Sequence, residues 1–333
     1  MGIILKKAWV LLMALSWVIA LMGTAAECAP AKKVDYPKKR IELVVPYPPG
    51  GITDLTARSL ASVLPEYLGQ PVVVVNKAGG ARLEGGEYVA SRKPDGYTLL
   101  LAPPSVGWPE IHFKDPPYKS SDLVPVCQVI GIRQTLTVAA DSKYKSLKEI
   151  EKDLEANPDL KIQVGNTGAG AMPHMVAVGF AAYIKQKDRM IQIPFQGDAG
   201  VITALLGKHI PLGSITGTGV VAQAQAGTVR VLGITGEKRW NKLPDVPTLD
   251  ELGYKLGFGI GDNSLYAPKK TPKEVIRVLN EAIAKAIQHK AFIALADKAG
   301  IPVEYEPHDQ FMKTFEARKA IMGQLIKELG MLK

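Results

Sequence analysis

The chain has 333 residues, of which 47% are hydrophobic and 22% are charged, and its formal net charge at pH 7 is +9. This composition excludes a disordered or fibrous protein, and the length predicts two domains rather than one core. The positive charges form no basic tract interleaved with aromatic residues, so we expect no nucleic-acid partner, and a mild positive excess attracts small anions.

The N-terminal segment has the pattern of a secretory signal peptide. Lys6 and Lys7 precede the apolar run AWVLLMALSWVIALMG, and Thr24 and Ala26 occupy the small-residue positions before a cleavage site. A retained membrane anchor is the alternative, although the run is short for a membrane span. We therefore expect residues 1–26 to be a signal peptide and the mature protein to be exported.

The chain contains two cysteines, Cys28 and Cys127. An exported protein can form a disulfide between them. Cys127, however, lies in the apolar run LVPVCQVIGI, and free cysteine is among the most buried residue types. We expect Cys127 to be a buried thiol, with pairing to Cys28 as the alternative.

Short runs rich in β-branched residues alternate with helical patterns along the mature chain. The expected strands are residues 41–47, 71–76, 97–102, 161–165, 190–195 and 229–235. The expected helices between them are residues 54–64, 83–92, 146–156, 172–186, 198–206 and 217–226. Strands that alternate with helices predict βαβ units and parallel sheets covered by helices on both faces.

Several helix boundaries follow from single residues. Ser146 with Glu149 three residues later forms a capping box. Pro272 opens the helical pattern KEVIRVLNEAIAKAIQHK at a first-turn position, where proline is tolerated. Its apolar residues are spaced for one buried face, namely Leu279, Ile283 and Ile287. A final helix is expected at roughly 308–329.

The alternating pattern occurs in two blocks, and the terminal helices have no block of their own. We expect them to return to the first block, so that the chain crosses twice between two lobes. The predicted fold is an α/β clamshell in which two doubly wound sheets are joined by two crossover segments near residues 136–142 and 261–266. The predicted lobes are residues 36–135 with 263–333, and residues 136–262.

The loop in VVPYPPGGITDLTAR, residues 44–58, lies between a strand and a helix. Ligands of parallel α/β sheets bind beyond the carboxyl ends of the strands, where helix N-termini also offer free N–H groups. Gly50 and Gly51 let backbone amides approach a ligand, and Pro48 and Pro49 stiffen the loop. Thr53 or Asp54 is expected to cap the helix.

Other loops at strand ends have the same layout. They are VVVVNKAGGARLEGG with Gly79 and Gly80, LLLAPPSVG with Ser105, VGNTGAGAMPHM with Thr167 and Gly168, and IPFQGDAG with Gln196, Gly197 and Asp198. Loops that converge on one cleft would form a cage of amides and hydroxyls, which suits a carboxylate.

Motifs of catalysis are not evident. The histidines show no metal-ligand spacing, there is no G-x-S-x-G elbow, and GNTGAG lacks the spacing of a dinucleotide-binding loop. His174 follows a candidate loop and either contacts ligand or belongs to the core or surface. We expect no catalytic residue, no metal and no cofactor, and a hydrolase or transferase is the alternative.

At the level of whole motifs, the chain resembles the periplasmic substrate-binding receptors of tripartite tricarboxylate transporters, the Bug-type group. The resemblance lies in YPKKRIELVVPYPPGGITDLTARSLASVL, LGQPVVVVNKAGGA, KPDGYTLLLA, LPDVPTLDELGY and YAPKKTPKEVIRVLNEAI, which occur in the family's order. It implies a two-lobed periplasmic-binding-protein (venus-flytrap) fold. It also implies a monomeric, non-enzymatic receptor that closes on a small carboxylate and delivers it to a permease of one large and one small membrane subunit.

The resemblance also implies which residues contact the ligand. Combined with the loop argument, the expected ligand-binding residues are Tyr47, Pro49, Gly50, Gly51, Thr53, Asp54, Gly79, Gly80, Ala81, Ser105, Thr167, Gly168, Gln196, Gly197, Asp198 and Asp262. Asp198 is either a helix N-cap or an acid that receives a ligand amine or shares a proton. The polar run of residues 262–264 stands where the family often has bulky aromatics, which disfavours an aromatic ligand.

The identity of the carboxylate stays open, because backbone amides recognise the carboxylate group and not what it is attached to. A ligand-sensing receptor for a membrane signalling protein is the alternative function, because it would use the same fold.

Overall fold

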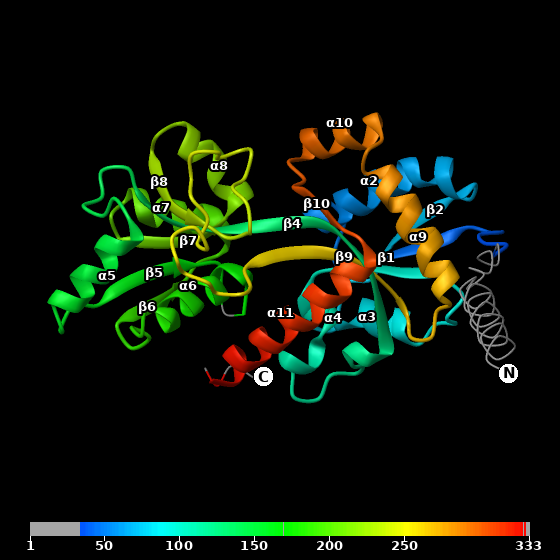
Figure 1. Cartoon of the computed structure of the whole chain (residues 1–333), viewed down its shortest axis with the longest axis horizontal. Helices are drawn as coiled ribbons and strands as arrows, with labels where there is room; N and C mark the ends of the chain where they lie inside the picture. The colour runs from blue at the N-terminus through cyan, green and yellow to red at the C-terminus, as the bar shows by residue number, and fades with distance from the viewer. Residues whose placement is uncertain (1–33, 169, 329, 331–333) are drawn as a thin grey trace, which may run out of the picture. The chain divides into compact units, whose positions relative to one another are not determined.

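The computed structural model describes residues 34–168, 170–328 and 330, and the expected signal peptide lies outside them (Figure 1). The described residues from Asp35 onward form one compact unit. The strands are β1 (Ile41–Val45), β2 (Val72–Asn76), β3 (Thr98–Ala102), β4 (Leu123–Ala139), β5 (Ile162–Asn166), β6 (Met190–Pro194), β7 (Leu212–Thr216), β8 (Val229–Ile234), β9 (Ile260–Pro268) and β10 (Val303–Glu306).

The helices connect and cover these strands. They are α2 (Ile52–Leu68), α3 (Leu83–Ala90), α4 (Pro104–Gly107), α5 (Leu147–Ala156), α6 (Met172–Tyr183), α7 (Gly197–Leu206), α8 (Gly217–Gln225), α9 (Lys273–Ala286), α10 (Lys290–Ala299) and α11 (His308–Glu328). Short 3-10 turns lie at Gly80–Arg82, Pro109–Ile111 and Ser120–Asp122.

The first sheet is built on β1. Its apolar residues Ile41, Leu43 and Val44 are almost fully buried, because parallel strands are covered on both faces. β1 pairs in parallel with β2 and β3, with Leu43 opposite both Val74 and Leu99. β9 then pairs antiparallel with β3. The carboxyl ends of β1, β2 and β3 therefore lie along one edge of this sheet.

The second sheet repeats this arrangement around β5, which is parallel to both β6 and β7. β7 and β8 pair antiparallel with the C-terminal part of β4. The core on this side includes Leu136, Val164 and Phe180, each of which is 0% exposed.

Strand β4 belongs to both sheets. Residues up to Arg133 pair with β9, and residues from Gln134 onward pair with β7 and β8. β4 and β9 therefore run side by side between the two sets of elements (Figure 1). The prediction of a two-lobed α/β fold with two crossover segments is confirmed, and the crossovers are long paired strands rather than short links. The exact lobe boundaries stay a prediction.

Several local predictions are confirmed. Ser146 accepts the Glu149 amide at 3.3 Å and caps α5, while the Glu149 carboxylate accepts the Lys145 amide at 2.6 Å, so one half of the predicted capping box is present. Leu279, Ile283 and Ile287 are buried on one face of α9, and α9 packs against α2. Cys127 is buried, and burial raises the pKa of its thiol; Cys28, its alternative partner, lies outside the described residues. The sequence did not predict β10, which pairs with β4.

Candidate functional site

The first glycine loop is closed by one of its own carboxylates. Gly50, with a φ of 97°, donates its amide to Asp54 Oδ2 at 2.9 Å. Asp54 also accepts hydrogen bonds from Asn76 Nδ2 at 2.8 Å and from Arg58 Nε at 2.9 Å. Burial acts to raise the pKa of Asp54, but these hydrogen bonds outweigh it and lower the pKa. Asp54 thus holds the loop in shape, and the Gly50 amide is already engaged.

The expected cap of α2 by Thr53 or Asp54 is wrong. Gly51 is the N-cap, and α2 has no side-chain cap among the described residues. Thr53 Oγ1 instead donates to Asn263 Oδ1 at 3.2 Å, and both side chains are buried. The start of α2 is therefore attached to the crossover strand β9, while Pro49 stays exposed in the loop.

The second loop ends in an arginine with an unusual backbone. Gly79, Gly80 and Ala81 lead into Arg82, whose amide donates to Gly79 O at 2.7 Å. Arg82 has a φ of 81°, in the left-handed region that large side chains rarely adopt. The Glu84 carboxylate packs against Gly79, so a β-carbon there would collide with it. The turn places the exposed Glu84 carboxylate beside Gly79 and leaves the Arg82 side chain exposed.

The loop before α6 is held by side chains of its own segment. Asn166 Oδ1 accepts the Gly168 amide at 3.0 Å, and His174 Nδ1 accepts the Gly170 amide at 3.2 Å. Burial lowers the pKa of His174, which is 9% exposed. His174 therefore shapes the loop, and Thr167 is half-buried within it.

Asp198 lies in the first turn of α7, and the expectation that it is the N-cap is wrong because Gln196 occupies that position. Thr216 donates both its amide, at 3.1 Å, and its hydroxyl, at 2.5 Å, to the Asp198 carboxylate. Gly197 enters the helix with a φ of 74°. Asp198 thus joins α7 to the start of α8, where Thr216 is the N-cap.

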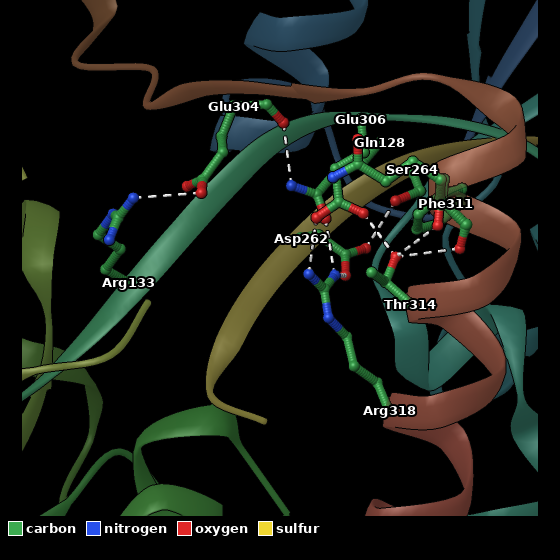
Figure 2. Close-up of polar contacts among 10 residues, drawn as sticks. Gln128, Arg133, Asp262, Ser264, Glu304, Glu306, Phe311, Thr314 and Arg318 are labelled. Carbon is green, nitrogen blue, oxygen red and sulfur yellow. Dashed lines mark hydrogen bonds and ion pairs between the residues drawn. The ribbon is translucent and has the colours of Figure 1, made fainter. Parts of the chain in front are cut away.

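Asp262 lies inside a polar network on the crossover strands. It is 2% exposed, accepts the Ser264 hydroxyl at 2.7 Å, and pairs with Arg318 of α11 at 3.3 Å (Figure 2). Arg318 also contacts Glu306 of β10 and Gln128 of β4, both at 2.8 Å. Burial raises the pKa of Asp262 to about 6, against the opposing effect of Arg318. These contacts tie α11 and β10 to both crossovers.

The network extends toward the second sheet. Gln128 Nε2 donates to Glu304 O at 2.9 Å, and the Glu304 carboxylate pairs with Arg133 at 3.1 Å (Figure 2). Arg133 also donates to Thr235 O, beyond the end of β8. The polar residues of the crossover therefore contact one another and the elements on both sides.

One cavity collects residues from several strand ends. It measures about 190 Å³. Its lining comes from the segments that follow β1, β2, β3 and β5, from the crossover strand β9 and from α11, and consists of Tyr47, Arg82, Pro103, Pro104, Ser105, Trp108, His112, Gly170, Ala171, Met172, Met175, Gly261 and Met322. Of the predicted site residues, Tyr47 and Ser105 line it.

The polar groups of this cavity influence one another. The Arg82 guanidinium is hydrogen-bonded to Tyr47, whose pKa is nevertheless raised by burial. Burial, with a smaller contribution from the Arg82 charge, lowers the pKa of His112 to about 4, so His112 is neutral at pH 7. Trp108 is 2% exposed, and its Nε1 has no hydrogen-bond partner within the described part of the chain.

Sequence reasoning missed most of these residues. Arg82 had a local signal, because it directly follows the Gly79-Gly80 turn at the end of β2. Trp108 and His112 follow the predicted loop at Ser105 without a motif of their own. Met322 had no local signal, since only the fold brings α11 to the loops of the first sheet. A larger hollow of 780 Å³ lies beside residues 238–242 and 300–304 and contains none of the predicted site residues.

Two further properties bear on chemistry. Across residues 34–168, 170–328 and 330, no cluster of three or more His, Cys, Asp or Glu side chains is placed to hold a metal ion. In the same residues no helix has the length and apolar character needed to cross a membrane.

Comparison with known proteins agrees with this architecture. Residues 56–331 match the family described as "Tripartite tricarboxylate transporter family receptor". Protein BugT of Bordetella pertussis is 34% identical over 295 residues, which cover 86% of this chain and 88% of BugT.

Solved structures are similar over the same extent. A TctC solute binding protein from Polaromonas, solved with no ligand, has a TM-score of 0.82 at 28% identity, covering 88% of this chain and 99% of that protein. R. palustris Rpa4515, solved with adipate, has a TM-score of 0.67 at 25% identity, covering 89% of this chain and 99% of that protein.

Proposed function

Because the chain belongs to the family of tripartite tricarboxylate transporter receptors, we propose that it is a periplasmic receptor that captures a small carboxylate in the 190 Å³ cavity. It binds the acid without converting it and delivers it to a membrane permease of one large and one small subunit. The signal-peptide pattern of residues 1–26 supports export.

One observation carries this proposal. Chain segments from the ends of β1, β2, β3 and β5 and from the crossover β9 line a single cavity, and a cation, Arg82, is among them. Ligands of α/β sheets bind at such strand ends, and a guanidinium matches a carboxylate in charge and shape. The adipate in R. palustris Rpa4515 shows that a similar protein holds a carboxylate.

The site assignment follows from this cavity. We propose that Tyr47, Ser105 and Arg82 contact the ligand, and that the exposed amides near Gly51 and the loop at Thr167 and Gly168 approach it when the lobes close. The proposed lobes are residues 36–135 with 263–333, and residues 136–262. Motion between them is expected at the crossovers β4 and β9.

A thermal-shift screen of residues 27–333 tests the proposal. Ligands that bind only the native state raise the melting temperature with concentration. Mono-, di- and tricarboxylates are compared with amides of the same shape, such as benzoate with benzamide. We expect stabilisation by one class of carboxylate and none by the matched amides. Folded protein that is stabilised by no carboxylate would contradict the proposal, and consumption of a bound acid would revive an enzymatic function.

A further inference from the structure

The charges that line the cavity are few. Of the described residues that line it, Arg82 alone carries a permanent charge. His112 is neutral at pH 7, because burial and then the nearby Arg82 charge lower its pKa to about 4. The neighbouring Glu110 is already paired with Lys319 at 2.6 Å. The cavity therefore offers one positive charge to a ligand.

The rest of the wall is largely apolar. Trp108, Met175 and Met322 are 2%, 1% and 2% exposed, and they belong to the same core cluster as Tyr266. Met172 and Pro104 extend this surface. Methionine side chains are polarizable and adapt to varied apolar shapes. The wall suits an alkyl chain or an aromatic ring, and a second carboxylate placed against it would be desolvated without a cationic partner.

The polar residues 262–264 of the crossover strand β9 do not add charge or polarity to the cavity wall. Asp262 and Ser264 are engaged in the polar network with Arg318 (Figure 2). Asn263 accepts the Thr53 hydroxyl. None of the three lines the cavity. The sequence argument that a polar crossover disfavours an aromatic ligand therefore loses its structural basis.

The backbone of Arg82 is strained, and strained residues often lie at functional sites. A φ of 81° strains any residue with a β-carbon, and such strain persists where the surrounding structure and function maintain it. The turn bond from the Arg82 amide to Gly79 O fixes this conformation. The Arg82 guanidinium is therefore held at the cavity. Trp108 also lines the cavity, and its Nε1 has no hydrogen-bond partner among the described residues.

We infer that the ligand is a monocarboxylate with an apolar body, and that Arg82 is the residue that selects it by binding its single carboxylate. This inference rests on the proposed receptor function and narrows it to one substrate class. A water occupies about 30 Å³ in the liquid, so a cavity of 190 Å³ holds about six waters and fits a short-chain or single-ring acid.

Hexanoate and adipate form the matched pair that tests the charge count, because they have the same chain length and differ by one carboxylate. The mature chain contains two tryptophans, Trp108 and Trp240, so Trp240→Phe leaves Trp108 as a fluorescent reporter inside the cavity. We expect hexanoate or benzoate to change the Trp108 emission saturably, with a Kd at least tenfold lower than that of adipate or citrate.

Three variants test the role of Arg82. Arg82→Gly removes the cation and relieves the backbone, since glycine adopts a positive φ without strain. We expect its melting temperature to equal or exceed that of the wild type, while the Kd for hexanoate rises at least tenfold. Arg82→Lys keeps a charge and should retain most of the affinity. Arg92→Gln removes an exposed arginine that stacks on Tyr88, outside the cavity, and should change nothing.

The outcomes separate the two proposals. If the folded wild type binds no carboxylate, the receptor function itself fails. If adipate or citrate binds at least as tightly as hexanoate, or if Arg82→Gly leaves the hexanoate Kd within twofold, the receptor function stands and the inference about substrate class is overturned.

Discussion

Individual carboxylates of this chain lie in or against the loops that the sequence assigned to a ligand, and one of them accepts a loop amide. Asp54 accepts the Gly50 amide, Glu84 packs on Gly79, and Asp198 accepts the Thr216 amide. A glycine loop at a strand end identifies a place where backbone groups are accessible. It does not show which anion occupies them, and here the nearest anion is often part of the protein.

Asp54 gives a prediction at this scale. Asp54→Asn keeps the shape but removes the charge from three hydrogen bonds, so we expect the free energy of unfolding to fall by about 1.5–3 kcal/mol at pH 7. The pKa of Asp54 is lowered in the folded state. Ionised Asp54 therefore stabilises the folded protein above the ordinary pKa of 3.8. This stabilisation is lost as the pH falls through the lower pKa that Asp54 has in the folded state.

Urea unfolding of both proteins between pH 7 and pH 3 measures this effect. The difference between wild type and Asp54→Asn should shrink on acidification. A difference that does not change with pH would show that the carboxylate charge of Asp54 does not stabilise the loop.

The protonation of His112 predicts a second dependence of stability on pH, over a different pH range. Its folded pKa of about 4 lies below the ordinary value of 6.5, so the neutral side chain stabilises the fold above pH 6.5. That contribution is lost as the pH falls from 6.5 toward 4, when the unfolded chain takes up the proton first. The stability of His112→Gln should depend less on pH across this range, and equal slopes for the two proteins would refute the assignment.

At the scale of elements, the strands next to the cavity were predictable, and the two crossovers were predicted only as short links. The apolar runs at β1, β2 and β3 are local patterns, and their ends could be placed from sequence. β4 is a single strand of 17 residues that pairs with one sheet and then the other, and this pairing is non-local. Tyr47 and Ser105 directly follow strands with local patterns, so the sequence placed them near the cavity. Met322 of α11 reaches the cavity only through non-local packing, so the sequence analysis missed it.

The network on the crossovers leads to a prediction for these elements. Asp262 has a folded pKa of about 6, raised from 3.8 chiefly by burial. Between these values the folded state binds more protons than the unfolded chain, so the contribution of Asp262 to stability falls as the pH rises from about 4 to about 6. Asp262→Asn should therefore gain stability relative to the wild type across that interval.

Chemical unfolding of both proteins at pH 4 and pH 6.5 would measure this relative gain in stability. Arg318 and Glu306 are the charged groups next to Asp262. If the relative stability of Asp262→Asn instead falls with rising pH, the ion pair with Arg318 dominates over burial.

At the scale of the whole molecule, the cavity exists only because distant segments meet. Loops of the first sheet contribute Tyr47 and Arg82, the second sheet contributes the start of α6, and the C-terminal helix contributes Met322. The sequence could predict the fold class and the edge of the sheets at which the loops that line the cavity lie. It could not predict the apolar wall, because no local pattern records which side chains the crossovers and α11 bring together.

The most direct test is a crystal structure of residues 27–333 with a bound monocarboxylate such as hexanoate. We predict that a carboxylate oxygen lies at hydrogen-bond distance, about 2.7–3.2 Å, from the Arg82 guanidinium, with the alkyl chain against Trp108 and Met322. A ligand bound away from Arg82, for example in the hollow beside residues 238–242, would contradict the account.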